Sequence, residues 1–293
     1  MEEANKKIKE LEMEMGSPNF WSDKNRAQTV IRQIAEYKNE LLGKDKYNKG
    51  HAIMTIFSGA GGDDAEDFSR ILYEMYSKYF EKQGWLSRIL DENENDHGGY
   101  RNLTLEIFGP NAYGMLKGEA GVHRLVRLSP FNSKNLRQTS FSMVEVSPKI
   151  EKDDEIKIPE NDLRVDISKA GGPGGQNVNK RETAVRITHI PTGISVRSTS
   201  ERSQPQNREK AMEILKGKLF TLREAEKKVM ESGSHISKTI SIDWGNQIRS
   251  YVFHPYKMIK DHRTGVETSN IDKVLNGDLD EFIEAERELG NKI

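Results

Sequence analysis

Apolar and polar residues recur along this chain with two periods, which predict strands and helices. Residues 52–57 alternate apolar and polar side chains, a pattern typical of a strand with one buried face. The same pattern predicts further strands at 85–90, 101–108, 122–128, 139–146, 163–167, 184–190, 194–199 and 244–252. Helical spacing of apolar residues predicts long helices at 63–83 and 206–230, and short ones at 111–117 and within 271–287. We therefore expect a mixed α+β fold.

The first 42 residues predict a pair of helices. Ile8, Leu11 and Met15 share one helical face, and a Gly-Ser-Pro turn at 16–18 ends that helix. Ser22 is placed to cap a second helix. Because two helices alone bury little apolar surface, this hairpin must pack against another part of the molecule.

Composition excludes several classes of protein. The 293 residues include no cysteine, so disulfides, thiol chemistry and cysteine-zinc sites are excluded. No apolar run approaches the roughly 20 residues that span a bilayer, and the first residues lack the apolar core of a signal peptide. The seven histidines lack the spacing and acidic surroundings of a metal site. We expect a cytoplasmic protein with no metal and no other cofactor.

The net charge of −1 hides an uneven distribution. Residues 162–231 carry 14 lysines and arginines against 9 aspartates and glutamates, a net charge of +5, so the remainder carries −6. A basic module within an acidic remainder suggests contact with a polyanion. Solvated helix faces give a similar pattern, so charge alone is weak evidence.

The stretch 169–180 reads Lys-Ala-Gly-Gly-Pro-Gly-Gly-Gln-Asn-Val-Asn-Lys. Its four glycines let the backbone approach a crowded partner, and Pro173 fixes one φ angle. A flexible linker is the ordinary interpretation of such a run, but a linker has no reason to continue from Gln176 directly into strand-like sequence. A nucleotide-phosphate loop does not fit, because no Gly-Lys-Ser/Thr ending follows.

This stretch resembles the Gly-Gly-Gln signature of peptide chain release factors. Family-like sequence extends from Phe20 to Ala285 and includes the segments 121–127, 186–193, 247–252 and 261–265. The tripeptide Ser129-Pro130-Phe131 resembles that of the bacterial class-I factor reading UAA and UGA, whereas the sister factor has a Pro-x-Thr type of tripeptide. The resemblance implies that the chain recognises a stop codon in the ribosomal A site and promotes hydrolysis of peptidyl-tRNA. Such a protein is not a self-contained enzyme, because the reaction takes place in the ribosomal active site.

The resemblance also implies an arrangement of the parts. We expect a shortened N-terminal helical domain at 1–48, a codon-recognition core at 49–158, a Gly-Gly-Gln peptide-release domain at 159–236, and a C-terminal segment at 237–293 that completes the core. The fold would then be α+β, with a short helical hairpin, an α/β core and an inserted α/β module. Candidate hinges lie at 149–160 and 231–241.

At the release end, the resemblance places Gly174, Gly175 and Gln176 beside the ester of the P-site peptidyl-tRNA. A glutamine has no useful pKa, so an electrostatic and positioning role suits it. Its backbone N–H would stabilise the departing 3′ oxygen and its side chain would restrict the nucleophile to water. A glutamine methyltransferase is the expected modifying partner of Gln176. Ribosomal RNA phosphates are the expected contacts of five basic residues, Lys169, Lys180, Arg181, Arg202 and Arg208.

At the codon-reading end, the resemblance assigns the second base to Ser129, whose hydroxyl can donate or accept a hydrogen bond. Pro130 and Phe131 would shape that loop. The resemblance also assigns the first-base uracil to Gly61 and Asp64, and the third base to Thr139, which stand at the matching positions. An isolated Ser-Pro-Phe would be an ordinary turn, but its family-like flanks favour the functional interpretation.

Three features depart from the family pattern. Gln138 stands where a histidine usually stacks between codon bases, and an amide stacks less well than an imidazole. Asp64 stands where a glutamate is usual, and both changes bear on which stop codons are read and how stringently. The N-terminal domain is a helix pair rather than a larger bundle, which bears on contact with a recycling GTPase.

Two alternatives have different functions. A codon-independent rescue factor shares the Gly-Gly-Gln module but usually lacks a full codon-reading domain. A protein that only binds RNA is favoured by the charge pattern alone and is opposed by the intact Gly-Gly-Gln. The expected partners are therefore the ribosome, with its 16S and 23S rRNA, the stop codon of the mRNA and the P-site peptidyl-tRNA. We expect a monomer with no membrane association.

Overall fold

The computed structural model describes residues 47–134, 136–150, 158–169, 182–232 and 246–290, together with Leu11, Met13, Met15, Arg26 and Val30. Most of the predicted N-terminal hairpin lies outside the described residues, as do residues 170–181 and most of both candidate hinges. Within the N-terminal part, Val30 is buried and packs against Leu11 and Met15.

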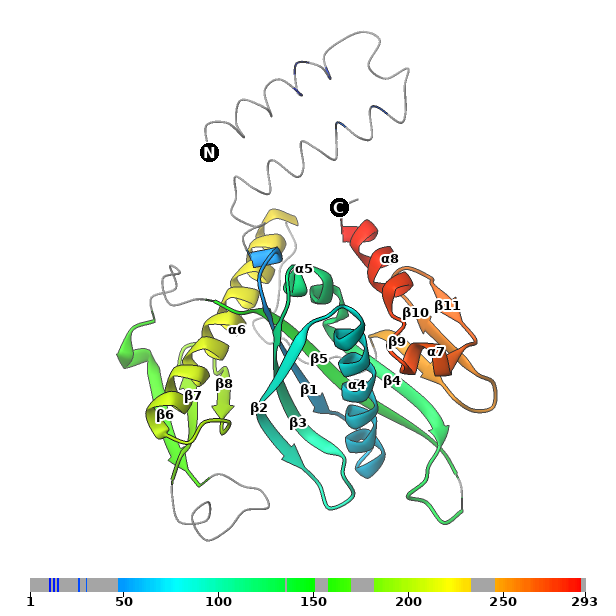
Figure 1. Ribbon diagram of the computed structural model, residues 1–293, viewed down its shortest axis with the longest axis horizontal. Coiled ribbons are helices and arrows are strands. Elements are labelled where there is room, and N and C mark those ends of the chain that lie inside the picture. Colours follow the sequence, from blue (N-terminus) through cyan, green and yellow to red (C-terminus); the bar gives the residue numbers. More distant parts are fainter. Residues whose placement is uncertain are drawn as a thin grey trace.

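Eight strands form one large sheet, in the order β11-β10-β9-β4-β5-β1-β3-β2 (Figure 1). They are β1 (Ala52–Ser58), β2 (Leu86–Glu94), β3 (Tyr100–Phe108), β4 (Gly121–Leu128), β5 (Arg137–Pro148), β9 (Gln247–Val252), β10 (Met258–Asp261) and β11 (Glu267–Thr268). Neighbouring strands run antiparallel, except that β4 and β9 are parallel. Through β9, residues near the C-terminus join the same sheet as the first strands.

Helices cover one face of the large sheet. They are α4 (Asp63–Lys82), α5 (Ala112–Leu116), the 3-10 turn η2 (Lys117–Glu119), α7 (Ile271–Leu275) and α8 (Asp280–Gly290). The first turn of α4 is acidic, which suits the positive end of a helix dipole. Its apolar residues bury themselves against the strands in the main core, which includes Phe68, Leu72, Met75, Tyr79, Leu103, Leu105, Val144 and Tyr251.

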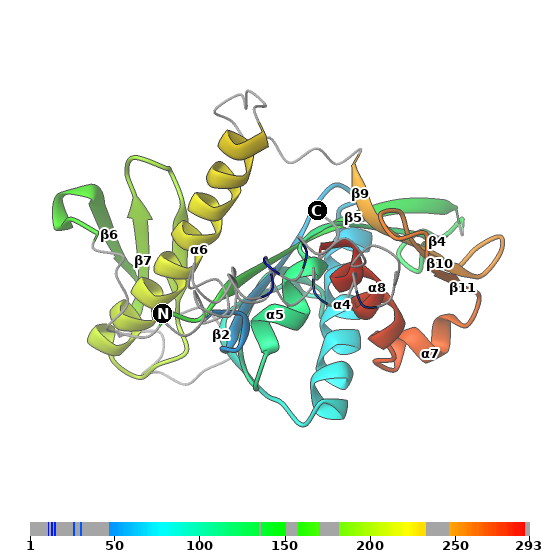
Figure 2. The same cartoon turned by 90° about the horizontal axis from the view of Figure 1, so that it is seen from above.

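A second, three-stranded sheet has the order β6-β7-β8 and packs with one long helix. Its elements are η3 (Glu160–Asp162), β6 (Leu163–Ser168), β7 (Ala184–His189), β8 (Ser195–Ser198) and α6 (Gln204–Ser232). This core also includes Ile53 and Leu90 from the large sheet, so α6 lies between the two sheets (Figures 1 and 2). The pattern at 206–230 predicts Ala225 on the buried face, but Ala225 is exposed, whereas Ala211 and Ile214 are buried.

Polar contacts join the smaller module to the large sheet. The Arg88 guanidinium lies 2.6 Å from the Glu201 carboxylate, and Thr199 Oγ1 donates a hydrogen bond of 3.1 Å to Asp91 Oδ1. Burial raises the pKa of Asp91, although the charge of Arg197 opposes that shift. The junction is therefore partly polar.

The strands β10 and β11 are absent from the sequence-based prediction. They span four and two residues, too few for an alternating pattern to be recognised. The predicted strand at 244–252 begins at Gln247 among the described residues. No helix in the described part of the chain is long and apolar enough to cross a membrane.

Candidate functional site

The predicted codon-reading residues gather where β4 ends and β5 begins, at one end of the central strands of the large sheet. We call this end of the sheet the codon-reading edge. Gly61 and Asp64 lie at the start of α4, the tripeptide 129–131 follows β4, and Gln138 and Thr139 lie at the start of β5. Because β4 and β5 are antiparallel, the end of one lies beside the start of the other, with Arg127 opposite Gln138 and Val126 opposite Thr139. In Figure 1 this edge is at the lower right.

The Asp64 carboxylate connects α4 to the end of β4. Its Oδ2 accepts a hydrogen bond of 2.6 Å from Ser129 Oγ, and its Oδ1 accepts one of 3.0 Å from Arg127 Nη2. Asp64 is 7% exposed and Ser129 is 2% exposed. A buried carboxylate needs such donors, and these contacts supply one to each of its oxygens.

Arg127 belongs to this site, although it is absent from the predicted set. Its Nη1 lies 2.6 Å from Asp67 Oδ2, so the guanidinium bridges two carboxylates on successive turns of α4. Strand alternation places residues 125, 127 and 129 on one face, which is the face that meets the acidic start of α4. A basic residue on the strand face that meets an acidic helix start is the sequence signal by which Arg127 could have been predicted.

Ser129 holds the loop after β4 through three hydrogen bonds. Its hydroxyl donates to Asp64 and accepts from the backbone N–H of Phe131 at 3.2 Å. Its own N–H donates to the carbonyl of Leu136 at 3.0 Å. A hydroxyl has one proton and two lone pairs, so one lone pair on Ser129 Oγ remains available.

The other predicted readers surround Ser129. Pro130, Gln138 and Thr139 are exposed, and Phe131 is 41% exposed. Gly61 has φ +139°, and a Cβ there would lie 3.0 Å from Ser140 Oγ. Both the backbone angle and the lack of space require glycine at this position.

The predicted release residues Gly174, Gly175 and Gln176 lie outside the described residues, as do Lys180 and Arg181. The flanking strands are described: β6 ends at Ser168, which pairs with Ala184 of β7. The segment between them therefore leaves and re-enters one end of this strand pair. Lys169, Arg202 and Arg208 are exposed on the same module. Figure 1 shows the strands of this module, β6 to β8, on the other side of the molecule from the end of β4.

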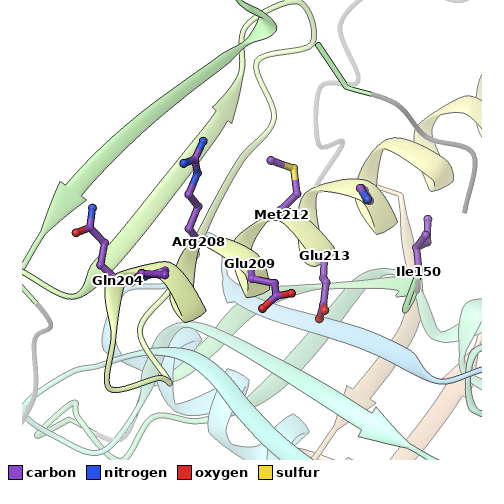
Figure 3. Close-up of a pocket in the computed structure, with 8 residues that line it drawn as sticks. Ile150, Gln204, Arg208, Glu209, Met212 and Glu213 are labelled. Atoms are coloured by element: carbon purple, nitrogen blue, oxygen red, sulfur yellow. The ribbon is translucent and has the colours of Figure 1, made fainter. Parts of the chain in front are cut away.

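A groove with a cavity volume of about 560 Å³ runs along α6. Figure 3 shows Arg208 and Met212 on one side of the helix and Glu209 and Glu213 on the other. Of the predicted site residues, only Arg208 lines it. Within the described ranges, no cluster of histidine and carboxylate side chains is arranged to hold a metal ion.

A buried ionic network lies near the start of β4, at the opposite end of this strand from Ser129. Arg249 on β9 donates two hydrogen bonds to the Glu119 carboxylate, at 2.6 and 2.7 Å, and one of 3.1 Å to Asp261. Burial alone would raise the pKa of Asp261, but hydrogen bonds from Arg263 and the charge of Arg249 lower it to about 2. The family-like segments 247–252 and 261–265 therefore supply residues of this buried network and have a structural role.

His123 lies in the same network and should make stability depend on pH. Burial, reinforced by the charge of Arg249, lowers the pKa of His123 to about 4, from 6.5 for a free histidine. Below pH 6.5 the unfolded chain therefore binds a proton that the folded chain does not. The stabilisation is complete above pH 6.5 and is lost as the pH falls towards 4. We expect the free energy of unfolding to fall by about 1.4 kcal/mol per pH unit in this window.

Urea unfolding at about pH 6 and about pH 5 measures this slope, since carboxylates contribute mainly at lower pH. A His123→Gln variant is the control, because glutamine does not titrate but can still hydrogen-bond. The variant should lose most of the slope. An unchanged slope would show that another group is responsible.

Comparisons with known proteins cover almost the whole chain. The PCRF domain model matches residues 33–144 and the RF-1 domain model matches residues 150–263. The chain is 42% identical over 329 residues to "Peptide chain release factor 2" of Listeria monocytogenes serotype 4b (strain F2365), covering 95% of this chain and 90% of that protein. It is 49% identical over 257 residues to "Peptide chain release factor 2" of Clostridium perfringens (strain SM101 / Type A), covering 87% and 70%. The solved structure of "RF2 of Thermus thermophilus" matches with a TM-score of 0.74 and 34% identity, covering 98% of this chain and 94% of that one.

Proposed function

We propose, from the premise that this chain belongs to the peptide chain release factor 2 family, that it reads UAA and UGA through the residues around Asp64 and Ser129. Membership of the family means that the chain terminates translation at stop codons on the ribosome. It is not itself an enzyme but triggers hydrolysis of peptidyl-tRNA by the ribosome. The residue roles and codon specificity below are our proposal.

The hydrogen bonds of Ser129 support reading of either purine at the second position. With its proton on Asp64, Ser129 Oγ keeps one lone pair that can accept from the amino group of adenine. Guanine instead presents an acceptor oxygen, and the hydroxyl can turn from Asp64 and donate to it. Arg127 would then still stabilise the Asp64 charge. A hydroxyl that can either accept or donate therefore fits the second base of both UAA and UGA.

The remaining readers act around this hydroxyl. Gly61 and Asp64, at the start of α4, accommodate the first-base uracil. Position 61 has no room for a side chain, because a Cβ there would lie against Ser140. Thr139 meets the third base, and Gln138 lies exposed beside it. Pro130 and Phe131 shape the loop.

At the release end, Gly174, Gly175 and Gln176 are proposed to enter the peptidyl transferase centre. Lys169, Lys180, Arg181, Arg202 and Arg208 are proposed to contact ribosomal RNA phosphates, and a glutamine methyltransferase is proposed to act on Gln176.

The chain is proposed to divide into four parts, at 1–48, 49–158, 159–236 and 237–293, the first of which is a shortened N-terminal helical hairpin. It is proposed to be a monomer in the cytoplasm. The pairing of β9 with β4 supports a core completed by the C-terminal segment.

Release from ribosomes programmed with UAA, UGA, UAG or a sense codon tests the specificity. We expect similar kcat/KM for peptide release on UAA and UGA. On UAG it should be lower by about 5- to 150-fold, the discrimination of roughly 1–3 kcal/mol that one well-read base supplies. Equal release on sense and stop codons would instead favour the rescue function. Efficient release on UAG would contradict the UAA and UGA assignment.

A further inference from the structure

The turn between β2 and β3 contacts the codon-reading loop through two aromatic rings. The imidazole of His97 and the ring of Phe131 have centroids 5.7 Å apart, and their planes are inclined by 42°. This separation is typical of aromatic pairs that attract each other. The contact is on the surface, since His97 is exposed and Phe131 is 41% exposed. The ring of Phe131 is therefore held against the β2–β3 turn.

His97 is itself held in place by Asn95. The side-chain oxygen of Asn95 accepts hydrogen bonds from the backbone N–H groups of His97 and Gly99, at 2.9 and 2.7 Å. The Asn95 amide donates at 2.6 Å to Glu66 Oε2, in the first turn of α4. The turn also approaches α4 closely, because a Cβ on Gly99 would lie 2.7 Å from the carbonyl carbon of Glu66. The backbone of His97 is thereby fixed relative to the helix that carries Asp64.

These contacts form a closed ring. His97 meets Phe131, the N–H of Phe131 donates to Ser129 Oγ, and Ser129 Oγ donates to Asp64. Asp64 lies two residues before Glu66, which binds Asn95 and so returns to His97. A shift of the Phe131 backbone would move the donor that helps orient the Ser129 hydroxyl.

We propose that His97 is a positioning residue for stop-codon reading, holding the Phe131 ring so that the Phe131 N–H orients the Ser129 hydroxyl. The proposal rests on the role of Ser129 proposed above. The face of the imidazole supplies the contact, so another aromatic side chain should replace it and a methyl group should not. The effect should fall on codon binding, because His97 acts through its contact with Phe131 in the loop that holds Ser129.

Release kinetics of His97→Ala and His97→Phe test the proposal. On UAA and UGA, His97→Ala should raise KM by about two- to tenfold, the worth of one aromatic pair, with kcat unchanged. His97→Phe should bring KM back to within about twofold of the unchanged chain. Release on UCA, a sense codon that differs from UAA at the second base, should change less than release on UAA.

A surface histidine outside the codon-reading loop supplies the control. His189 bonds Thr192 on the smaller module, and His189→Ala should leave KM unchanged. Failure of the unchanged chain to prefer stop codons would remove the proposed function itself. With that preference intact, three results would overturn the role of His97. They are that His97→Ala behaves like the unchanged chain, that His97→Ala lowers kcat without raising KM, or that His97→Phe fails to restore KM.

Discussion

Replacing Gly175 with alanine is expected to abolish peptide release while leaving binding to a stop-codon-programmed ribosome almost intact. The stretch 169–180 contains no aspartate, glutamate, histidine or cysteine. In the role proposed for this stretch, backbone groups act close to the ester, where water is the nucleophile. A Cβ at position 175 would keep that backbone away. Removing one hydrogen-bond donor of this kind from an active site typically costs 100- to 1000-fold, so we expect release at saturating factor to fall at least about 100-fold.

Single-turnover release and a binding competition measure the two effects separately. Gly193 in the turn after β7 provides a matched glycine-to-alanine control on the same module. It has φ +72° and nothing within 4 Å of an added Cβ, so Gly193→Ala should cost about 1–2 kcal/mol of stability and leave release unchanged. Loss of ribosome binding by Gly175→Ala would contradict the expectation and make the loop mainly a docking element.

Strands and long helices could be predicted because each carries its own pattern. The alternation at 101–108 corresponds to β3 at Tyr100–Phe108, and that at 163–167 to β6 at Leu163–Ser168. Short strands such as β10 and β11 show no period, and they exist because β9 offers them a partner. Local patterns therefore located the elements, whereas pairing partners distant in the chain decided the rest of the sheet.

The positions of the proposed codon-reading residues follow from the sequence, but their contacts with one another do not. Ser129 and Asp64 are recognisable in the sequence, yet their hydrogen bond depends on where β4 meets α4. Arg127 had a local signal in the alternation of its strand, beside an acidic helix start. His97 had none, because its partner Phe131 lies in a separate hairpin.

Replacing Asp64 with alanine should reduce stop-codon reading far more than the same change at Asp67. Both carboxylates are buried on α4 and both bind Arg127, but only Asp64 accepts the hydrogen bond from Ser129. A hydrogen bond to a charged group contributes about 1.5–3 kcal/mol, so Asp64→Ala should lower kcat/KM on UAA by about 10- to 150-fold. The loss on UGA should be smaller, because the Ser129 hydroxyl turns from Asp64 to donate to guanine.

Asp67→Ala is the matched control, since it also removes one carboxylate from Arg127. Asp67→Ala also removes the ion pair of Asp67 with Arg70, so it should cost at least as much stability in urea as Asp64→Ala. It should nevertheless retain kcat/KM to within about fivefold. The difference in release reports the contact with Ser129, because Arg127 keeps one carboxylate in either variant, and the further partner of Asp67, Arg70, pairs along α4 with Asp67 and Glu74. Equal losses of release would mean that Arg127, and not the Ser129 hydroxyl, makes this edge competent to read a codon.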